Sequence, residues 1–420
     1  MKKSTQLARQ VIRAIGCANG LAGRQLGCEN AVEVIKASTY LAGVQTRLPL
    51  EWGKIIEEVN TGRHASAMSG VTQTCRQLAH ETRQVIENKE ELLVFGGDHS
   101  CAIGTWSGVA TAMRPVGDIG LIWVDAHMDA HTPDTSDTGN IHGMPVAHLL
   151  GFGDKTLVKI GDRLPKLLPH NLCMVGIRDY ESAEQELLEK LGVRIFYAHE
   201  VEKRGIQDVM QEAQYLVTRN TIGYGLSIDL DGFDVSYAPA VGTPSADGIN
   251  ALEFIKALLT IDLTKLIATE IVEFLPRFDD TQRTSEQLVS SLVEYIYKTK
   301  QFQINSVNEI AQRHFQFLLI LLLVLMARLD CKICLKVYKS NRAKSTPRIL
   351  TNCGHTLCEA CAETLLAQHV GEIICPYDRK ITIIDGGVEQ LHKNYAILAY
   401  IDELQEEGNV SDDEEEPEQG

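Results

Sequence analysis

Three short apolar runs, each followed directly by a cluster of carboxylates and histidines, constrain the fold of this chain most strongly. Runs this short and continuous are typical of strands buried on both faces of a parallel sheet. In an open α/β sheet, the residues just past the strand ends meet in one crevice. We therefore predict a doubly wound α/β domain, with a mostly parallel sheet and helices on both faces, in which the clusters converge. The runs are residues 92–95, 120–124 and 225–228, and the clusters are GGDHS (96–100), DAHMD (125–129) and DLDGFD (229–234).

The clusters contain the residue types that bind hard metal ions. On an extended backbone, the i, i+2 and i+4 spacing of Asp125, His127 and Asp129 aims these side chains the same way. Aspartates with a minority of imidazoles favour Mn²⁺ or Mg²⁺ over metals that prefer thiolates. One such cluster alone is a weak signal, because aspartates also cap helices. Three at strand ends indicate a metal site, with candidate ligands His99, Asp125, His127, Asp129, Asp229 and Asp231.

These motifs resemble those of the ureohydrolases, and of arginase in particular, over about residues 10–300. The resemblance also includes TGNIHG (138–143), GIRD (176–179), APAVGTP (238–244) and Glu273. It implies hydrolysis of L-arginine to L-ornithine and urea by a hydroxide that bridges two Mn²⁺ ions, in a homo-oligomer, either a trimer or a hexamer. The implied ligands are His99, Asp125, Asp129 and Asp229 for one ion and Asp125, His127, Asp229 and Asp231 for the other, with Asp125 and Asp229 bridging.

The resemblance assigns further roles around the metal ligands. Asp129 would pass a proton to the leaving nitrogen, and His142 would exchange protons with solvent. Glu273 would pair with the guanidinium through a charge-assisted contact. The residues implied for substrate binding are His131, Thr138, Asn140, Glu181, Glu184 and Thr243. Among them, Glu181 and Glu184 stand where acidic residues of the family face the α-amino group of the substrate.

Two of these positions depart from the pattern of animal arginases. His131 stands where an asparagine reads the α-carboxylate of the substrate, and Thr138 replaces a serine. An imidazole also donates hydrogen bonds to carboxylates, so His131 is compatible with that task. The alternative is that His131 is an ordinary solvated loop residue. We expect L-arginine as the substrate and leave agmatine or another guanidino compound as the alternative.

A cysteine-rich segment nearer the C-terminus has the spacing of a zinc domain. Thiolates with one imidazole at this density indicate structural Zn²⁺ in a reducing compartment and not disulfides. A unit this small also needs metal in order to fold. The eight candidate ligands are Cys331, Cys334, Cys353, His355, Cys358, Cys361, Cys375 and Asp378.

This segment resembles a RING finger over about residues 329–400. The resemblance implies a ubiquitin-conjugating enzyme as partner, with Ile333 and Pro376 in the contact surface and Arg379 bonded to ubiquitin. The alternatives are an interaction module without ligase activity, and a ligase that uses the α/β domain as a scaffold. At the eighth ligand position Asp378 stands where the commonest RING pattern has a cysteine. Carboxylate oxygen is an acceptable zinc ligand. The implied interleaved sets are Cys331, Cys334, Cys358 and Cys361 for one zinc and Cys353, His355, Cys375 and Asp378 for the other.

The length of 420 residues also predicts more than one unit. The predicted organisation is a hydrolase domain (1–300), an apolar linker (301–328), the RING finger (329–400) and an acidic, disordered tail (401–420). The apolar run 315–326 is shorter than the roughly 20 residues that span a membrane. A buried linking helix, a peripheral membrane contact and a junction of two joined gene models near Met326 remain alternatives.

The net charge and the cysteine spacing limit the partners and the cellular compartment that we expect for this protein. A formal net charge of −16 argues against general affinity for nucleic acid or anionic membranes. The cysteines before residue 300 have no paired spacing, and the N-terminus has no apolar h-region. We expect a cytoplasmic protein, with a mitochondrial presequence in the acid-free residues 1–28 as the weaker alternative.

Overall fold

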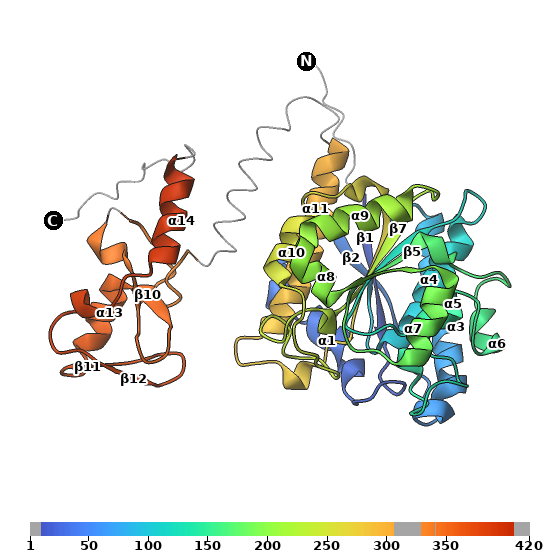
Figure 1. Cartoon of the computed structure of the whole chain (residues 1–420), viewed down its shortest axis with the longest axis horizontal. Coiled ribbons are helices and arrows are strands. Elements are labelled where there is room, and N and C mark those ends of the chain that lie inside the picture. Colours follow the sequence, from blue (N-terminus) through green and yellow to red (C-terminus); the bar gives the residue numbers. More distant parts are fainter. Residues whose placement is uncertain (1–9, 306–328, 341, 407–420) are drawn as a thin grey trace, which may run out of the picture. The chain divides into compact units, whose positions relative to one another are not determined.

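The three apolar runs form strands near the middle of one sheet in the computed structural model, which describes residues 10–305, 329–340 and 342–406 (Figure 1). The chain divides into two compact units at Ile304. The predicted domain boundary at residue 300 lies inside the last helix of the first unit, α11 (Thr284–Asn305). Beyond that boundary, Gln303 Nε2 donates to Ile261 O at 2.8 Å, so the fold of the first unit continues past residue 300.

The first unit contains an eight-stranded sheet in the order β2-β1-β3-β8-β7-β4-β5-β6, with every neighbouring pair parallel. This arrangement confirms the predicted α/β fold with a parallel sheet. The runs predicted as buried strands are β3, β4 and β7, and every residue in these strands is buried. The strands are β1 (Ile12–Ala18), β2 (Leu50–Glu57), β3 (Glu91–Phe95), β4 (Gly120–Val124), β5 (Leu172–Ile177), β6 (Arg194–Tyr197), β7 (Tyr224–Asp229) and β8 (Leu266–Val272).

Helices cover both faces of this sheet, with α3, α4 and α5 on one side and α10 and α11 on the other (Figure 1). Helix α3 buries residues at helical spacing, among them Val71, Leu78 and Val85. Helix α4 packs so closely on α3 at Gly108 that any side chain there would clash. A Cβ added at Gly108 would lie 2.0 Å from Thr82 Oγ1. The helices are α1 (Ala31–Lys36), α2 (Thr39–Gln45), α3 (Met68–Glu87), α4 (Ala102–Met113), α5 (Pro145–Leu149), α6 (Lys155–Val158), α7 (Ser182–Leu191), α8 (Ala198–Arg204), α9 (Ile206–Thr218), α10 (Ala251–Leu258) and α11.

The second unit is a small fold with its own core. Two antiparallel strand pairs, β9–β10 and β11–β12, accompany the helices α13 and α14. The core contains Leu350, Leu357 and Ile373 together with several of the cysteines. Its elements are β9 (Pro347–Ile349), β10 (Thr356–Cys358), α13 (Glu359–Leu366), β11 (Glu372–Ile374), β12 (Ile381–Ile383) and α14 (Tyr395–Glu406).

The predicted start of the acidic tail at residue 401 is wrong. Residues 401–406 continue α14, because Leu398 and Ile401 lie one helical turn apart and are both buried in the second unit. The apolar run 315–326 lies outside the described residues, and so do residues 407–420. Among the described residues, no helix is both long and apolar enough to cross a bilayer.

Candidate functional site

The three sequence clusters meet at the carboxyl ends of adjacent strands. Strands β3, β8, β7 and β4 are neighbours in the sheet, and each is followed by polar residues of the site. His99 follows β3, Glu273 follows β8, Asp231 follows β7, and His127 follows β4. This is the edge at which parallel α/β sheets form their ligand crevices.

Tight turns, and not extended backbone, aim most of these side chains. His99 and Asp231 each lie in a 3₁₀ turn directly after a strand. Asp98 Oδ1 accepts a hydrogen bond from Ser100 N at 3.1 Å and so fixes the first turn. Asp129 has a left-handed φ of 49°, so the prediction of an extended backbone through Asp129 is wrong. The ligands converge because these turns fold the chain back over the strand ends.

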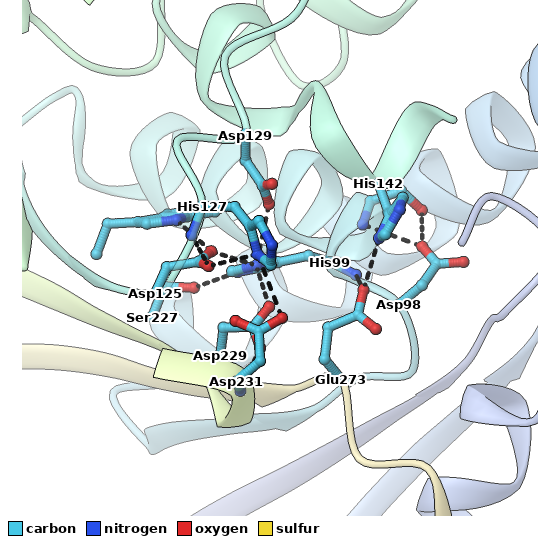
Figure 2. Close-up of polar contacts among 12 residues, drawn as sticks. Asp98, His99, Asp125, His127, Asp129, His142, Ser227, Asp229, Asp231 and Glu273 are labelled. Atoms are coloured by element: carbon cyan, nitrogen blue, oxygen red, sulfur yellow. Dashed lines mark hydrogen bonds and ion pairs between the residues drawn. The ribbon is translucent and has the colours of Figure 1, made fainter. Parts of the chain in front are cut away.

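The imidazoles and carboxylates form two overlapping groups (Figure 2). His99 Nδ1 lies 3.2 Å from Asp125 Oδ2, 3.2 Å from Asp129 Oδ2 and 3.0 Å from Asp229 Oδ2. His127 Nδ1 lies 3.4 Å from Asp125 Oδ1 and 3.3 Å from Asp231 Oδ2. Asp125 therefore presents one oxygen to each imidazole, which is the placement required of a bridging ligand.

The chemistry of this centre fits a divalent cation. His99 Nδ1 is buried and has no hydrogen-bond partner among the described residues, although three carboxylate oxygens surround it. Burial and the charges of Asp231 and Asp125 raise the pKa of Asp229 well above its usual range. Burial, followed by the charge of Asp125, raises the pKa of Asp129 to about 7. A bound cation would offset this repulsion, and the oxygen-rich donor set suits Mn²⁺.

A buried hydrogen-bond chain orients His99 from behind. Ser227 Oγ donates to Glu270 Oε2 at 2.8 Å, and Trp106 Nε1 donates to the same oxygen at 2.9 Å. Since the Ser227 hydroxyl donates to Glu270, it accepts from His99 Nε2 at 3.0 Å, and Nδ1 keeps its lone pair toward the carboxylates. The sequence patterns did not predict these hydrogen bonds. Their signal was a serine and a glutamate inside strands that are otherwise largely apolar, β7 and β8.

Glu273 and His142 form a second buried pair beside the metal-ligand groups. Glu273 Oε1 accepts from His142 Nδ1 at 3.0 Å and from His99 N at 2.9 Å, while Cys28 Sγ donates to Oε2 at 3.4 Å. Burial opposes protonation of His142, but Glu273 outweighs it and raises the pKa of His142 to about 9. Glu273 has a left-handed φ of 62°. Such strain in a non-glycine residue persists only where the surrounding structure holds it.

A cavity of about 230 Å³ lies against these groups. The candidate substrate residues all line it, and Thr243 Oγ1 donates to Asp231 Oδ2 at 2.7 Å. Asp234, the last carboxylate of the third cluster, lies elsewhere, in a separate cavity of about 880 Å³ beyond Arg178. The smaller cavity brings together His131, Thr138, Asn140, Glu181, Glu184 and Thr243 with His127, Asp129, His142 and Glu273.

The second unit places its candidate zinc ligands in two interleaved clusters. The 11 cysteines of the chain all lie in the described ranges, and each is a free thiol. Within each cluster the donor atoms lie within 4.8 Å of one another. The clusters contain the same residues as the two sets that the RING resemblance implies: Cys331, Cys334, Cys358 and Cys361, and Cys353, His355, Cys375 and Asp378.

Asp378 occupies the same backbone position as Cys334 in a second copy of one turn. In the first turn, Leu335 N donates to Cys331 O at 2.7 Å, and Leu335 has a φ of 58°. In the second turn, Arg379 N donates to Cys375 O at 3.0 Å, and Arg379 has a φ of 63°. Because the two turns match, the carboxylate of Asp378 stands where a thiolate would bind zinc, and carboxylate oxygen is an acceptable ligand.

Comparisons with known proteins agree with both units. The family model of the arginase family matches residues 11–297, and that of the RING-type zinc finger matches residues 331–376. The arginase of Bacillus caldovelox is 38% identical over 224 residues, which cover 53% of this chain and 74% of that protein.

Solved structures show the same likeness. The native structure of Bacillus caldovelox arginase matches with a TM-score of 0.64 at 31% identity, covering 69% of this chain and 98% of that chain. Entamoeba histolytica arginase in complex with L-ornithine matches with a TM-score of 0.63 at 26% identity, covering 69% and 99%. The chain therefore belongs to the arginase family, and a RING-type zinc finger follows its arginase domain.

Proposed function

We propose that the first unit hydrolyses L-arginine to L-ornithine and urea with two Mn²⁺ ions bound. The observation that carries this proposal is the pair of imidazole–carboxylate groups that share Asp125 and border the same cavity as Glu273. By the arginase resemblance, one ion would be held by His99, Asp125, Asp129 and Asp229, and the other by Asp125, His127, Asp229 and Asp231. When bound, two such ions lower the pKa of a shared water and orient it for attack on the guanidinium carbon.

The residues around the ligands supply the remaining tasks. The carboxylate of Glu273 would accept N–H groups of the guanidinium while it also accepts the Nδ1 proton of His142. His142 donates its Nδ1 proton to Glu273 and lines the cavity, so its ring is placed to carry protons between the cavity and solvent. Asp129 would pass a proton to the leaving nitrogen through the carboxylate that faces His99.

The test measures urea released from L-arginine by the full chain loaded with Mn²⁺. His142→Ala should keep the manganese content and lower kcat by about 10²–10⁴-fold, the contribution typical of general acid–base catalysis. Asp234→Ala serves as a control, because this carboxylate belongs to the third cluster but lies in the other cavity. Faster hydrolysis of agmatine than of arginine would overturn the substrate assignment. Full turnover by His142→Ala would overturn the proposed role of His142 in proton transfer.

We also propose that the second unit recruits a ubiquitin-charged conjugating enzyme. Ile333 and Leu335, which flank Cys334 in the first turn, are 40% and 73% exposed. Pro376 and Arg379 are exposed in the matching second turn. The apolar patch suits contact with the conjugating enzyme, and the exposed cation beside it suits a hydrogen bond to the attached ubiquitin. The alternative is an interaction module without ligase activity.

A discharge assay separates these two functions. The full chain should release ubiquitin from at least one charged enzyme in a broad panel, and Arg379→Ala should keep two zinc ions yet slow this release. Lys344→Ala is the control, because Lys344 is an exposed cation elsewhere in the unit. If the zinc-loaded chain discharges no enzyme in the panel, the interaction module replaces the ligase.

A further inference from the structure

The buried carboxylate of the implied amino-group subsite already has partners within the protein. Glu184 is 5% exposed. Its Oε1 accepts a hydrogen bond from Ala130 N at 2.9 Å, and its Oε2 accepts one from Glu181 N at 3.0 Å. Oε1 therefore holds backbone of the loop after β4, and Oε2 holds backbone at the start of α7. A ligand would have to compete with these bonds.

His131 contacts the other carboxylate of that subsite, which belongs to Glu181. Its Nε2 lies 3.2 Å from Glu181 Oε2 and 3.4 Å from Glu184 Oε2. Its Nδ1 lies 3.1 Å from Thr135 Oγ1, so the ring is held at both nitrogens. The residue is only 8% exposed. One oxygen of Glu181 thus already faces a nitrogen of this chain, and the Glu181 side chain is otherwise largely exposed to water.

Besides the exposed carboxylates of Asp137 and Asp179, several polar groups that line this cavity offer hydrogen-bond donors. Asn140 Oδ1 contacts His64 Nδ1, so the Asn140 amide can meet a ligand only through its NH₂ group. Thr138 Oγ1 accepts from Asn140 N at 3.2 Å and lies 3.4 Å from Ser136 Oγ, so a ligand would compete with Ser136 for its hydroxyl hydrogen. The guanidinium of Arg24 lines the same cavity. Donors in this number suit a carboxylate.

We propose that this site recognises ω-guanidino carboxylates as a class, and that an α-amino group adds little to their binding. The proposal rests on the proposed hydrolysis of arginine and extends it to the analogue without the amino group. The carboxylate of a ligand can accept hydrogen bonds from Asn140, Thr138 and Arg24. An α-ammonium that approaches Glu181 meets a carboxylate that is 62% exposed to water and already faces His131 through Oε2. The new contact replaces hydration or the His131 contact, so it yields little net free energy.

Three substrates test the proposal in the full chain loaded with Mn²⁺: L-arginine, 5-guanidinopentanoate, which lacks the amino group, and agmatine, which lacks the carboxylate. The first two should have kcat/KM values within about tenfold, whereas agmatine should be lower by about 100-fold, since hydrogen bonds to a charged group account for roughly that range. A loss of 100-fold on 5-guanidinopentanoate, or equal turnover of agmatine and arginine, would overturn the proposal.

The variant His131→Asn tests the cause. Releasing Glu181 should raise the preference for arginine over 5-guanidinopentanoate by about tenfold, mainly through KM. His80→Asn is the matched control, because His80 is an exposed histidine on α3, and it should leave this preference unchanged. An unchanged preference in His131→Asn would show that His131 does not set the specificity.

A binding measurement separates this inference from the hydrolase assignment. Calorimetry compares L-ornithine with 5-aminopentanoate on the same Mn²⁺-loaded chain. Dissociation constants within about tenfold support the inference even if neither guanidino acid yields urea, a result that defeats only the proposed function. Ornithine bound 100-fold more tightly would overturn the inference even if arginine is hydrolysed.

Discussion

His99 divides its two nitrogens between the protein and the metal centre. Nε2 is bonded to Ser227, whose hydroxyl donates onward to Glu270, and Nδ1 faces three carboxylate oxygens. The ring also stacks on Trp123 with centroids 4.0 Å apart. The tautomer and the ring plane are thus set before a metal arrives, and partners of this kind tune the affinity of metal sites.

Removal of the Ser227 hydroxyl should therefore weaken metal binding. We expect Ser227→Ala to lower Mn²⁺ affinity by about 10–100-fold, with urea production recovered at excess Mn²⁺, as metal titration would measure. Ser290→Ala is the control, since Ser290 is a buried serine whose hydroxyl has no hydrogen-bond partner among the described residues. Equal losses in both variants would assign the effect to packing.

The sequence predicted which residue types gather at this site and in which order, but not what supports them. Asp98 is a conspicuous carboxylate of the first cluster, yet it caps a turn and bonds Asn19 Nδ2 at 2.9 Å. Asn19 lies 79 positions away in the chain. Partnerships of this kind depend on strand order, which no local pattern contains. The same holds for His131 and Glu181, whose contact forms only once α7 packs beside the second cluster.

At the scale of elements, a buried side chain ties a short helix to the loops around it. His148 lies in the last turn of α5, where its Nδ1 donates to Met144 O at 2.8 Å and its Nε2 accepts from Asp154 N at 3.0 Å. Both ring nitrogens are satisfied in the neutral form, and the side chain is buried. Burial therefore lowers the pKa of His148 from its ordinary 6.5.

This histidine should make stability depend on pH. Below about pH 6.5 the unfolded chain takes up a proton that the folded chain refuses, so the stabilising effect is complete above that pH and is lost as pH falls. Compared with wild type, His148→Gln should flatten the decline in unfolding free energy between about pH 7 and 5, measured by urea denaturation. His170→Gln, an exposed control, should keep the wild-type slope. Parallel curves for wild type and His148→Gln would contradict this account.

Elements with a strong local signal were predictable, and those defined by packing were not. The buried strands β3, β4 and β7 followed from continuous apolar runs. The 3₁₀ turns that aim His99 and Asp231 have no such pattern, because aspartates fix them through single side-chain bonds. The tail was placed from residue 401 because of its acidic composition, although the buried side chain of Ile401 holds this part of α14 to its core.

At the scale of the whole molecule, one chain combines two kinds of metal site. The first unit offers aspartates and imidazoles, which suit Mn²⁺, and the second offers mainly thiolates, which suit Zn²⁺. The two units have separate hydrophobic cores. Each metal set should therefore respond only to changes in its own unit.

Metal analysis of the full chain with and without one bridging ligand tests the central claim most directly. Wild type should contain manganese at the two Asp125-sharing groups and zinc at the two cysteine clusters. Asp125→Ala should lose the manganese and all urea production, because both groups share that residue, while the zinc content stays at the wild-type level. An Asp125→Ala chain that keeps its manganese and its arginine turnover would contradict the binuclear site.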